Sequence, residues 1–306
     1  MEELDEKSSW YVLLMVVLGG IVGLVFGSAL GLLVGWTLYQ GNGDFLHLAN
    51  DPDEYSIIPL MAMQGIVSIF SFFVFPYLTW RLFRRKSIHI LNTQPFFNLS
   101  LAFVAAILFS FMVVDSFFIE WNQHIHFPEF LKSFETWART SEDQLAEITK
   151  KLTQFHSVGE FATGFFVIAV IAGVCEEFMF RGIIQNEFYR GTKNIHVAVW
   201  VSAILFSAIH AQFFGFVPRM LLGALFGYLY YWSGNVFVPI LAHVINNGFL
   251  VIMIYLNQLG IVKIDVETEE AAPWYAIIIF AFIGTGLIYY YKNFLDQKKN
   301  RPADGQ

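Results

Sequence analysis

The chain is poor in charge and in cysteine, and both shortages restrict what it can be. Only 14% of its 306 residues are charged, whereas 56% are hydrophobic and 18% are aromatic. Because soluble domains carry about 25% charged residues, this composition predicts an all-α, polytopic membrane protein. The single cysteine, Cys175, excludes an intrachain disulfide and any metal site built from several cysteines. The sequence has no basic patch or motif suited to nucleic acid, which is therefore not an expected partner.

Several catalytic patterns are also missing. No serine stands in a GxSx setting, which disfavours a serine nucleophile of the rhomboid type, and no HExxH motif is present. Asp115 lies within an apolar segment, but no second aspartate occupies a comparable segment. This argues against an aspartyl intramembrane protease. We interpret Asp115 and Cys175 as structural residues.

Apolar segments long enough for membrane helices dominate the chain. A helix needs about 20 apolar residues to span a bilayer, and we expect about eight such segments here. They lie roughly at 10–38, 56–80, 97–119, 158–180, 195–213, 217–233, 236–257 and 273–291. The first contains small residues at i, i+4 spacing, which favours close packing against another helix.

The charges between these segments predict one orientation in the membrane. A basic cluster at 81–86 follows the second segment, and basic loops are retained in the cytoplasm. The acidic stretches at 41–54 and 265–270 then face outward, and the basic tail faces inward. We therefore expect a multi-pass protein of the cell membrane with both termini in the cytoplasm.

Residues 121–157 form one sizeable insert between the apolar segments. Apolar residues from Phe127 to Trp137 repeat at helical spacing, and Ser141 with Gln144 resembles a capping box that opens a second helix. We interpret the insert as two amphipathic helices lying on the outer membrane surface. A lid, or a platform on which a partner docks, is the alternative.

Two adjacent glutamates, Glu176 and Glu177, end an apolar run and give the strongest functional signal. An acidic residue in mid-bilayer costs about 2.5–3.5 kcal/mol on insertion scales. Glu177 and Arg181 stand at i, i+4 and face each other on a helix, so Glu177 is expected to be a structural anchor. Glu176 has no local cation, and the small residues Ala172 and Gly173 one turn before it allow another helix to approach. A carboxylate in that setting can act as a general base for water.

Two further apolar segments supply polar side chains. His210 lies in one of them, and His243 and Asn247 lie one turn apart in the other. If His210 faces Glu176, the pair can hold and deprotonate a water molecule. If His243 and Asn247 face the same point, they can donate hydrogen bonds to the oxyanion that forms on a peptide carbonyl. Asn246 competes with Asn247, because a residue at i+3 also faces His243, roughly.

The predicted orientation places this site near the cytoplasmic face. Arg181 is expected to mark the boundary, and Glu176 lies deeper by roughly 7–8 Å at 1.5 Å per residue. We expect a water-poor cavity that opens to the cytoplasm and admits both water and substrate.

Taken in order, the three segments that carry these polar residues resemble motifs of the CPBP family of CAAX proteases and bacteriocin-processing enzymes, also called the ABI family. The family shows EExxxR, then FxxxH, then HxxxN, which stand here at 176–181, 206–210 and 243–247. Each motif is weak alone, whereas the ordered trio within membrane segments is specific. The resemblance covers approximately residues 158–255.

The resemblance implies a helical intramembrane endopeptidase that hydrolyses a peptide bond. The same resemblance implies that Glu176 and His210 activate water. His243 and Asn247 stabilise the oxyanion, and the family's choice of Asn247 over Asn246 agrees with the i, i+4 geometry. The implied substrate is a membrane-associated protein, prenylated or a peptide precursor, so that protein substrate and membrane lipid are the expected partners.

The resemblance also implies that Glu177 and Arg181 support the site. The family has often been labelled metalloprotease, and a metal held by Glu176, His210 and His243 is chemically possible. We expect no required cofactor, with zinc as the minority alternative.

Two non-proteolytic functions stay open. One is an immunity or scaffold protein that binds a partner without catalysis. The other is a transporter that uses buried Glu and His as a relay, although no internal repeat or matched pair of broken helices is present. The expected organisation is N-terminal membrane helices at 1–120, the extracytoplasmic insert at 121–157, the catalytic core at 158–255, and a last membrane helix with a basic cytoplasmic tail at 256–306.

Overall fold

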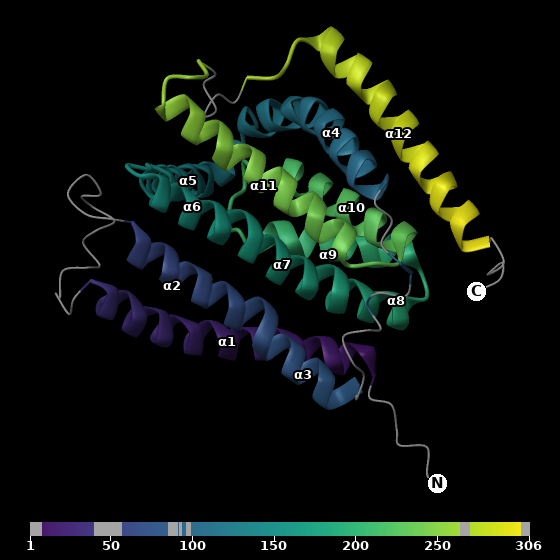
Figure 1. Cartoon of the computed structure of the whole chain (residues 1–306), viewed down its shortest axis with the longest axis horizontal. Coiled ribbons are helices and arrows are strands. Elements are labelled where there is room, and N and C mark those ends of the chain that lie inside the picture. The colour runs from purple at the N-terminus through teal and green to yellow at the C-terminus, as the bar shows by residue number, and fades with distance from the viewer. Residues whose placement is uncertain are drawn as a thin grey trace.

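The computed structural model describes residues 8–39, 57–84, 91, 94–95, 99–263 and 270–300. For residues 299 and 300 it describes the backbone alone. Every regular element in these ranges is a helix, and the fold is an all-α bundle (Figure 1). The α-helices are α1 (Ser9–Leu38), α2 (Ile58–Ser68), α3 (Phe75–Arg84), α4 (Leu99–Gln123), α5 (Lys132–Leu152), α6 (Val158–Phe165), α7 (Ala172–Glu177), α8 (Asn186–Thr192), α9 (Ile195–Ala208), α10 (Phe216–Ser233), α11 (Phe237–Gln258) and α12 (Trp274–Asn300). The others are a 3₁₀ turn at Glu129–Leu131 and π-helical segments at Ile69–Val74, Phe166–Ile171 and Phe178–Gln185.

Among the described residues, six helical runs are long and apolar enough to cross a membrane. They are Ser9–Leu38, Ile58–Arg84, Leu99–Gln123, Val158–Thr192, Phe237–Gln258 and Trp274–Lys298. The other two expected segments form α9 and α10. α9 has only 14 residues, which reach about 21 Å, less than the roughly 30 Å of a bilayer core. The chain is therefore a multi-pass membrane protein, and the structure supports six spans by length and composition.

Glycines of α1 let it lie in backbone contact with α2 and the segment after it. A Cβ atom on Gly23 would stand 2.2 Å from the carbonyl oxygen of Phe70, and one on Gly27 would stand 3.1 Å from Cα of Val67. Any side chain at Gly23 would therefore push the helices apart. The close packing predicted from the glycine spacing is confirmed.

The longest helical run, Val158–Thr192, carries the glutamate pair near its middle. It continues well beyond the expected end at residue 180, and π-helical segments flank α7 within it. Wide π-helical turns disturb the regular backbone pairing, and side chains compensate for this. The Ser202 hydroxyl donates to the carbonyl of Phe180 at 3.1 Å, and the Asn186 amide donates to the carbonyl of Gly182 at 2.9 Å. Helix α7 is thus held between two irregular but satisfied segments.

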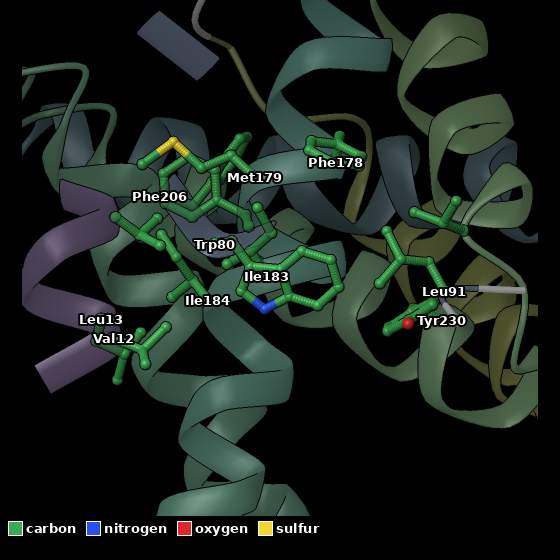
Figure 2. Close-up of a cluster of buried hydrophobic side chains, with 13 residues drawn as sticks. Val12, Leu13, Trp80, Leu91, Phe178, Met179, Ile183, Ile184, Phe206 and Tyr230 are labelled. Atoms are coloured by element: carbon green, nitrogen blue, oxygen red, sulfur yellow. The ribbon is translucent and has the colours of Figure 1, made fainter. Parts of the chain in front are cut away.

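A cluster of buried apolar side chains joins α1 and α3 to the segment that follows α7 (Figure 2). Val12 of α1 and Ile183 of the π-helical segment are fully buried in it. Phe206 of α9, which belongs to the FxxxH pattern, is part of the same cluster. Because protein interiors are close-packed, this continuity fixes α9 against the run that carries the glutamates.

The insert differs from the two-helix prediction. α4 extends to Gln123, a short 3₁₀ turn follows, and α5 then runs without a break from Lys132 to Leu152. The predicted capping box at Ser141 is wrong, because Ser141 lies inside α5. No glycine or proline interrupts this stretch, and good helix formers on both sides of Ser141 allow the helix to continue. In Figure 1, α5 lies at the end of the bundle opposite to α8.

The start of α1 and the end of α12 lie at the same end of the bundle, near the ends of α3 and α8 (Figure 1). At this end Arg84 forms a buried ion pair with Glu187 and donates a further hydrogen bond to the Ser9 hydroxyl at 3.1 Å. Arg84 was counted in the basic cluster that sets the orientation. It is neutralised by Glu187, so it adds no free charge to the surface.

Much of the remaining evidence for orientation lies outside the described residues. Arg85 and Lys86, the acidic loop at 41–54, residues 265–269 and the tail at 301–306 belong to this group. The placement of both termini in the cytoplasm therefore stays a prediction.

Candidate active site

Glu177 and Arg181 form an ion pair inside the bundle. Glu177 Oε1 lies 2.6 Å from Arg181 Nη1, and the two side chains are 0% and 1% exposed. Arg181 Nη2 donates to the carbonyl of Gly223 at 2.9 Å, and the guanidinium lies 4.6 Å from the centre of the Phe206 ring. A pair buried this deeply needs such additional partners to offset the loss of water. The spacing-based expectation that the two residues face each other agrees with this geometry.

The burial of Arg181 corrects its predicted position. We expected it to mark the cytoplasmic boundary, but it is enclosed by protein, and its helical run continues to Thr192. The boundary argument treats a basic residue as solvated. Here a carboxylate, a carbonyl and an aromatic face replace water around the guanidinium. The side of the membrane to which the site opens stays a prediction.

His243 of α11 contacts both glutamates. Its Nδ1 lies 2.9 Å from Glu177 Oε1, and its Nε2 lies 4.0 Å from Glu176 Oε2. The close approach of α11 depends on Gly173, where a Cβ atom would stand 2.9 Å from Cγ2 of Val244. As the sequence predicts, a small residue at this position admits a neighbouring helix. In the neutral ring, donation from Nδ1 to the carboxylate leaves Nε2 with a free lone pair directed toward Glu176.

Glu176 has a different environment from its neighbour. Its side chain is 12% exposed. Its Oε2 atom is buried without a hydrogen-bond partner among the described residues. Successive residues on a helix point about 100° apart, which places Glu177 against Arg181 and leaves Glu176 turned toward His243. The site thus contains one carboxylate paired with an arginine and one that is not, and each keeps an Oε2 atom without a hydrogen-bond partner among the described residues.

His210 follows α9 directly. Its Nδ1 lies 2.8 Å from the carbonyl of Phe206, and its ring meets the Phe206 ring edge to face at 5.3 Å. A carbonyl only accepts, so Nδ1 carries the proton and Nε2 is an acceptor in the neutral ring. The next residue, Ala211, has φ of 53°, which is unusual for a residue with a side chain. No hydrogen bond joins His210 to Glu176 in the part of the chain that the structure describes.

Asn247 turns toward the helical run that carries the glutamates. Its Nδ2 donates to the carbonyl of Ile168, in a π-helical segment, at 3.0 Å. Asn246 donates to Asn247 Oδ1 at 3.1 Å and so supports it from behind. The i, i+4 argument favoured Asn247 as the residue on the same face as His243, and its role in the site stays a prediction. Its amide keeps one N–H bond that the Ile168 carbonyl does not use.

Comparison with known proteins matches this region of the chain. Residues 159–249 fit the family described as type II CAAX prenyl endopeptidase, Rce1-like. That range contains the glutamate pair, both histidines and Asn247. This part of the chain, from α6 into α11, is thus similar to the CPBP family.

Curated proteins similar to this chain match over the same part. The membrane-embedded CAAX protease MroQ of Staphylococcus aureus is 32% identical over 120 residues, which cover 37% of this chain and 47% of MroQ. The putative membrane peptidase YdiL of Bacillus subtilis is 33% identical over 87 residues, which cover 28% of this chain and 35% of YdiL. The matches therefore span about half of each relative or less. No solved structure gave a significant match.

Within the described ranges, no group of three His, Cys, Asp or Glu side chains is arranged to hold a metal ion. His243 directs Nδ1 at Glu177, and His210 directs Nδ1 at a backbone carbonyl, which leaves Nε2 of each neutral ring as an acceptor. The zinc alternative with Glu176, His210 and His243 stays a prediction, and we derive no catalytic step through a metal.

The structure adds residues that the motifs do not include. The Phe226 ring lies 5.4 Å from the His243 ring and 5.5 Å from the Arg181 guanidinium. Arg219 of α10 is in electrostatic range of Glu176. The sequence could have indicated Arg219, because it is a charged residue at the start of an apolar segment, and a charge in an apolar segment is also what identified Glu176. The sequence could not have indicated Phe226, because aromatic residues are common in apolar helices.

One cavity near the site does not reach the glutamates. It has a volume of about 550 Å³ and lies at the α8 end of the bundle, with Trp80, Asn186, Arg190 and Tyr230 among its lining residues. Glu176 is not part of that lining. The predicted water-poor cavity and its cytoplasmic opening therefore stay predictions.

Asp115 and Cys175 lie outside the assembled contacts. Cys175 is buried beside Glu176 and takes part in no disulfide. Asp115 is buried in α4, with Oδ1 lacking a hydrogen-bond partner among the described atoms. Within the described part of the chain, neither side chain forms a hydrogen bond or ion pair with His210 or His243, and we keep the structural interpretation of both residues.

Proposed function

We propose that this protein is an intramembrane endopeptidase in which Glu176 acts as the general base for water. The supporting observation is the difference between the two adjacent glutamates. Glu177 is fully buried and held through Oε1 by Arg181 and His243, whereas Glu176 is 12% exposed, lies beside His243 Nε2 and has no ion pair with an arginine or lysine among the described residues. Both carboxylates keep an Oε2 atom without a hydrogen-bond partner among those residues. A base needs a free lone pair within reach of the proton that it removes, and Glu176 offers one on the carboxylate that solvent reaches.

His210 is proposed to position the attacking water with Glu176. Its Nδ1 proton is committed to the Phe206 carbonyl, which leaves Nε2 as an acceptor for a water hydrogen. Catalytic hydrogen bonds are often long in proteins without substrate and tighten when it binds. The absence of a direct His210–Glu176 bond among the described residues is compatible with a water between them.

The Glu177–Arg181 pair is proposed to orient His243. A carboxylate that accepts from one imidazole nitrogen fixes the tautomer and the ring plane. Asn247, which keeps one free N–H bond, is proposed to face the substrate carbonyl in the oxyanion-binding role that the motif implies. His243 can share that role only with both ring nitrogens protonated, because Nδ1 is committed to Glu177. No cofactor is required by this arrangement.

The proposed substrate is a protein or peptide bound at the membrane. MroQ is named a CAAX protease and YdiL a membrane peptidase, which supports proteolysis as the reaction class. A site within the bundle favours a substrate that reaches it from the lipid, such as a prenylated tail or a membrane-bound precursor. The surrounding membrane lipid is the second partner.

The test compares protein termini in membranes from cells that carry wild type, Glu176→Gln or Glu129→Gln at matched levels. Glu129 lies on the insert with a highly exposed side chain, so its variant controls for the loss of one carboxylate. New termini with wild type and Glu129→Gln, and none with Glu176→Gln, would support proteolysis and identify the substrate. Equal termini in all three strains would contradict it.

A proton relay is the second candidate, and Asp115 is the observation that favours it. A buried carboxyl group in a membrane helix, with one oxygen that has no hydrogen-bond partner among the described residues, suits proton transfer better than peptide hydrolysis. Proton flux in liposomes that Asp115→Asn abolishes would support a relay. Flux equal to that of empty liposomes would exclude it.

A further inference from the structure

A second arginine, Arg219, lies one turn of α10 before Gly223, whose carbonyl binds Arg181 of the site. Arg219 is in the first turn of α10, and its Nη2 donates to the side-chain oxygen of Gln212 in the preceding loop. The guanidinium lies over Gly215, where a Cβ atom would stand 3.4 Å from Nη2. Arg219 is in electrostatic range of both Glu176 and His210. The loop therefore holds a fixed positive charge at the site.

Arg219 and Glu176 each present one unused atom. Arg219 Nη1 and Glu176 Oε2 are both buried, and neither has a hydrogen-bond partner among the described residues. A buried polar group without a partner costs about 1–3 kcal/mol, and more if it is charged. The two groups have opposite charge and are not bonded to each other. Such a pair indicates a place for a third group that accepts from Arg219 while Glu176 acts on a neighbouring water.

The other polar groups near Glu176 offer at most one free neutral N–H bond, that of Asn247. His243 directs Nδ1 at Glu177, so its Nε2 is an acceptor in the neutral ring. Asn247 uses one of its two N–H bonds on the Ile168 carbonyl. An arginine is always protonated and cannot lose its donors near a carboxylate. Arg219 Nη1 is thus a permanently charged donor with no competing partner.

We propose that Arg219 is a further catalytic residue, which donates a hydrogen bond from Nη1 to the carbonyl oxygen of the peptide bond that is cut. This rests on the proposed function. Glu176 removes a proton from water, the water oxygen bonds to the carbonyl carbon, and the C=O π electrons move to the oxygen. Arg219 stabilises that oxyanion. When the intermediate collapses, the C–N bond breaks and the proton passes from Glu176 to the leaving amine.

Gln212 has a supporting role in this arrangement. Its side-chain oxygen accepts from Nη2, which restricts the rotation of the guanidinium, while Nη1 has no hydrogen-bond partner among the described residues. The insert holds the same loop, because the backbone N–H of Phe214 donates to Glu142 of α5 at 2.8 Å. Gln212 is thus a positioning residue, and its loss should be milder than the loss of Arg219.

The experiment uses the purified full-length protein in proteoliposomes and a fluorogenic peptide copied from a cleavage site that depends on Glu176. Arg219→Gln should lower kcat by about 10²–10³-fold, the usual effect of losing one oxyanion donor. Arg219→Lys should recover part of that loss, since a lysine keeps the charge but not the planar fork. The matched control is Arg81→Gln, which removes the charge of an exposed residue on α3. This variant should cleave the peptide at the wild-type rate.

Peptide binding separates this role from simpler ones. It is measured in Glu176→Gln and in Glu176→Gln/Arg219→Gln, neither of which is expected to cleave. Nearly equal affinities, together with the loss of kcat, would support transition-state donation. A loss of affinity as large as the loss of kcat/KM would overturn it, because Arg219 would then only bind the ground state. A pH–rate profile whose acid limb shifts in Arg219→Gln, with kcat restored at another pH, would also overturn it.

The two proposals fail in different ways. If Glu176→Gln cleaves at the wild-type rate, the proposed function fails whatever Arg219 does. If Glu176→Gln is inactive while Arg219→Gln and Arg219→Lys are fully active, only the role of Arg219 fails. Thermal unfolding of each variant in the same detergent checks that a slow variant is folded.

Discussion

His243 lies between two adjacent carboxylates, with Nδ1 2.9 Å from Glu177 Oε1 and Nε2 4.0 Å from Glu176 Oε2. One imidazole thus meets both members of the glutamate pair with opposite nitrogens. Arg181 neutralises Glu177 on its other side at 2.6 Å. The charge of Glu177 is therefore used to orient the ring, and Glu176 is left available for chemistry.

Removal of Arg181 should destabilise the whole bundle. In Arg181→Ala, Glu177 stays buried without its cation, and breaking a buried pair in this way costs about 3–5 kcal/mol. Thermal or denaturant unfolding in detergent measures the loss. The control is Lys132→Ala, which breaks the exposed Glu129–Lys132 pair on the insert and should change stability little. Equal stabilities of Arg181→Ala and wild type would contradict the account.

A methyl group at Gly173 should separate α7 from α11. The new Cβ would stand 2.9 Å from Cγ2 of Val244 and 3.3 Å from its backbone nitrogen. Overpacking of this kind costs about 1–3 kcal/mol, and the resulting shift lengthens the Glu177–His243 contact. Gly173→Ala should thus lose both stability and cleavage.

Gly286→Ala is the matched substitution for that test. No atom lies within 4 Å of a Cβ at Gly286, which is within a helix. Alanine there should be neutral or stabilising by about 0.5–1 kcal/mol, because glycine is the poorer helix former. If Gly173→Ala behaves like Gly286→Ala, α11 does not depend on Gly173 for its approach.

The insert should loosen in acid. The Phe127 backbone N–H donates to Glu135 at 3.0 Å and, with His126 and Arg139, holds the pKa of that carboxyl below its ordinary value. Because the folded pKa lies below the unfolded one, the stabilisation is present above the unfolded pKa and is lost as pH falls through the folded pKa. Hydrogen exchange over residues 124–139, corrected for intrinsic rates, should accelerate between pH about 7 and about 3.

Glu135→Gln supplies the control for this pH dependence. The amide cannot titrate, so the same segment should exchange faster at neutral pH and change little in acid. An acid-induced increase of equal size in Glu135→Gln and wild type would assign the effect to another group.

The sequence predicted the parts of the site that follow from helical spacing. The i, i+4 rule placed Glu177 against Arg181, and the small Gly173 correctly indicated a close helix neighbour. Helical spacing also predicted different environments for Glu176 and Glu177, because adjacent residues on a helix point in different directions. The glycine spacing of α1 predicted its close packing for the same reason.

The parts that the sequence did not predict depend on contacts between distant segments. Arg181 was expected at a boundary because its carbonyl partner, on Gly223, is in another helix. The break at Ser141 was wrong because a local capping pattern does not end a helix whose flanks favour continuation. The π-helical segments around α7 leave no clear pattern in the residues.

The most direct test of the central claim is hydrolysis of the Glu176-dependent peptide by the purified protein in water enriched with heavy oxygen. The account predicts one heavy oxygen in the new carboxylate of the product from wild type. It predicts no measurable product from Glu176→Gln, with the two proteins equally stable to heat. Cleavage by Glu176→Gln at the wild-type rate, with the same oxygen incorporation, would contradict the role of Glu176 as the base.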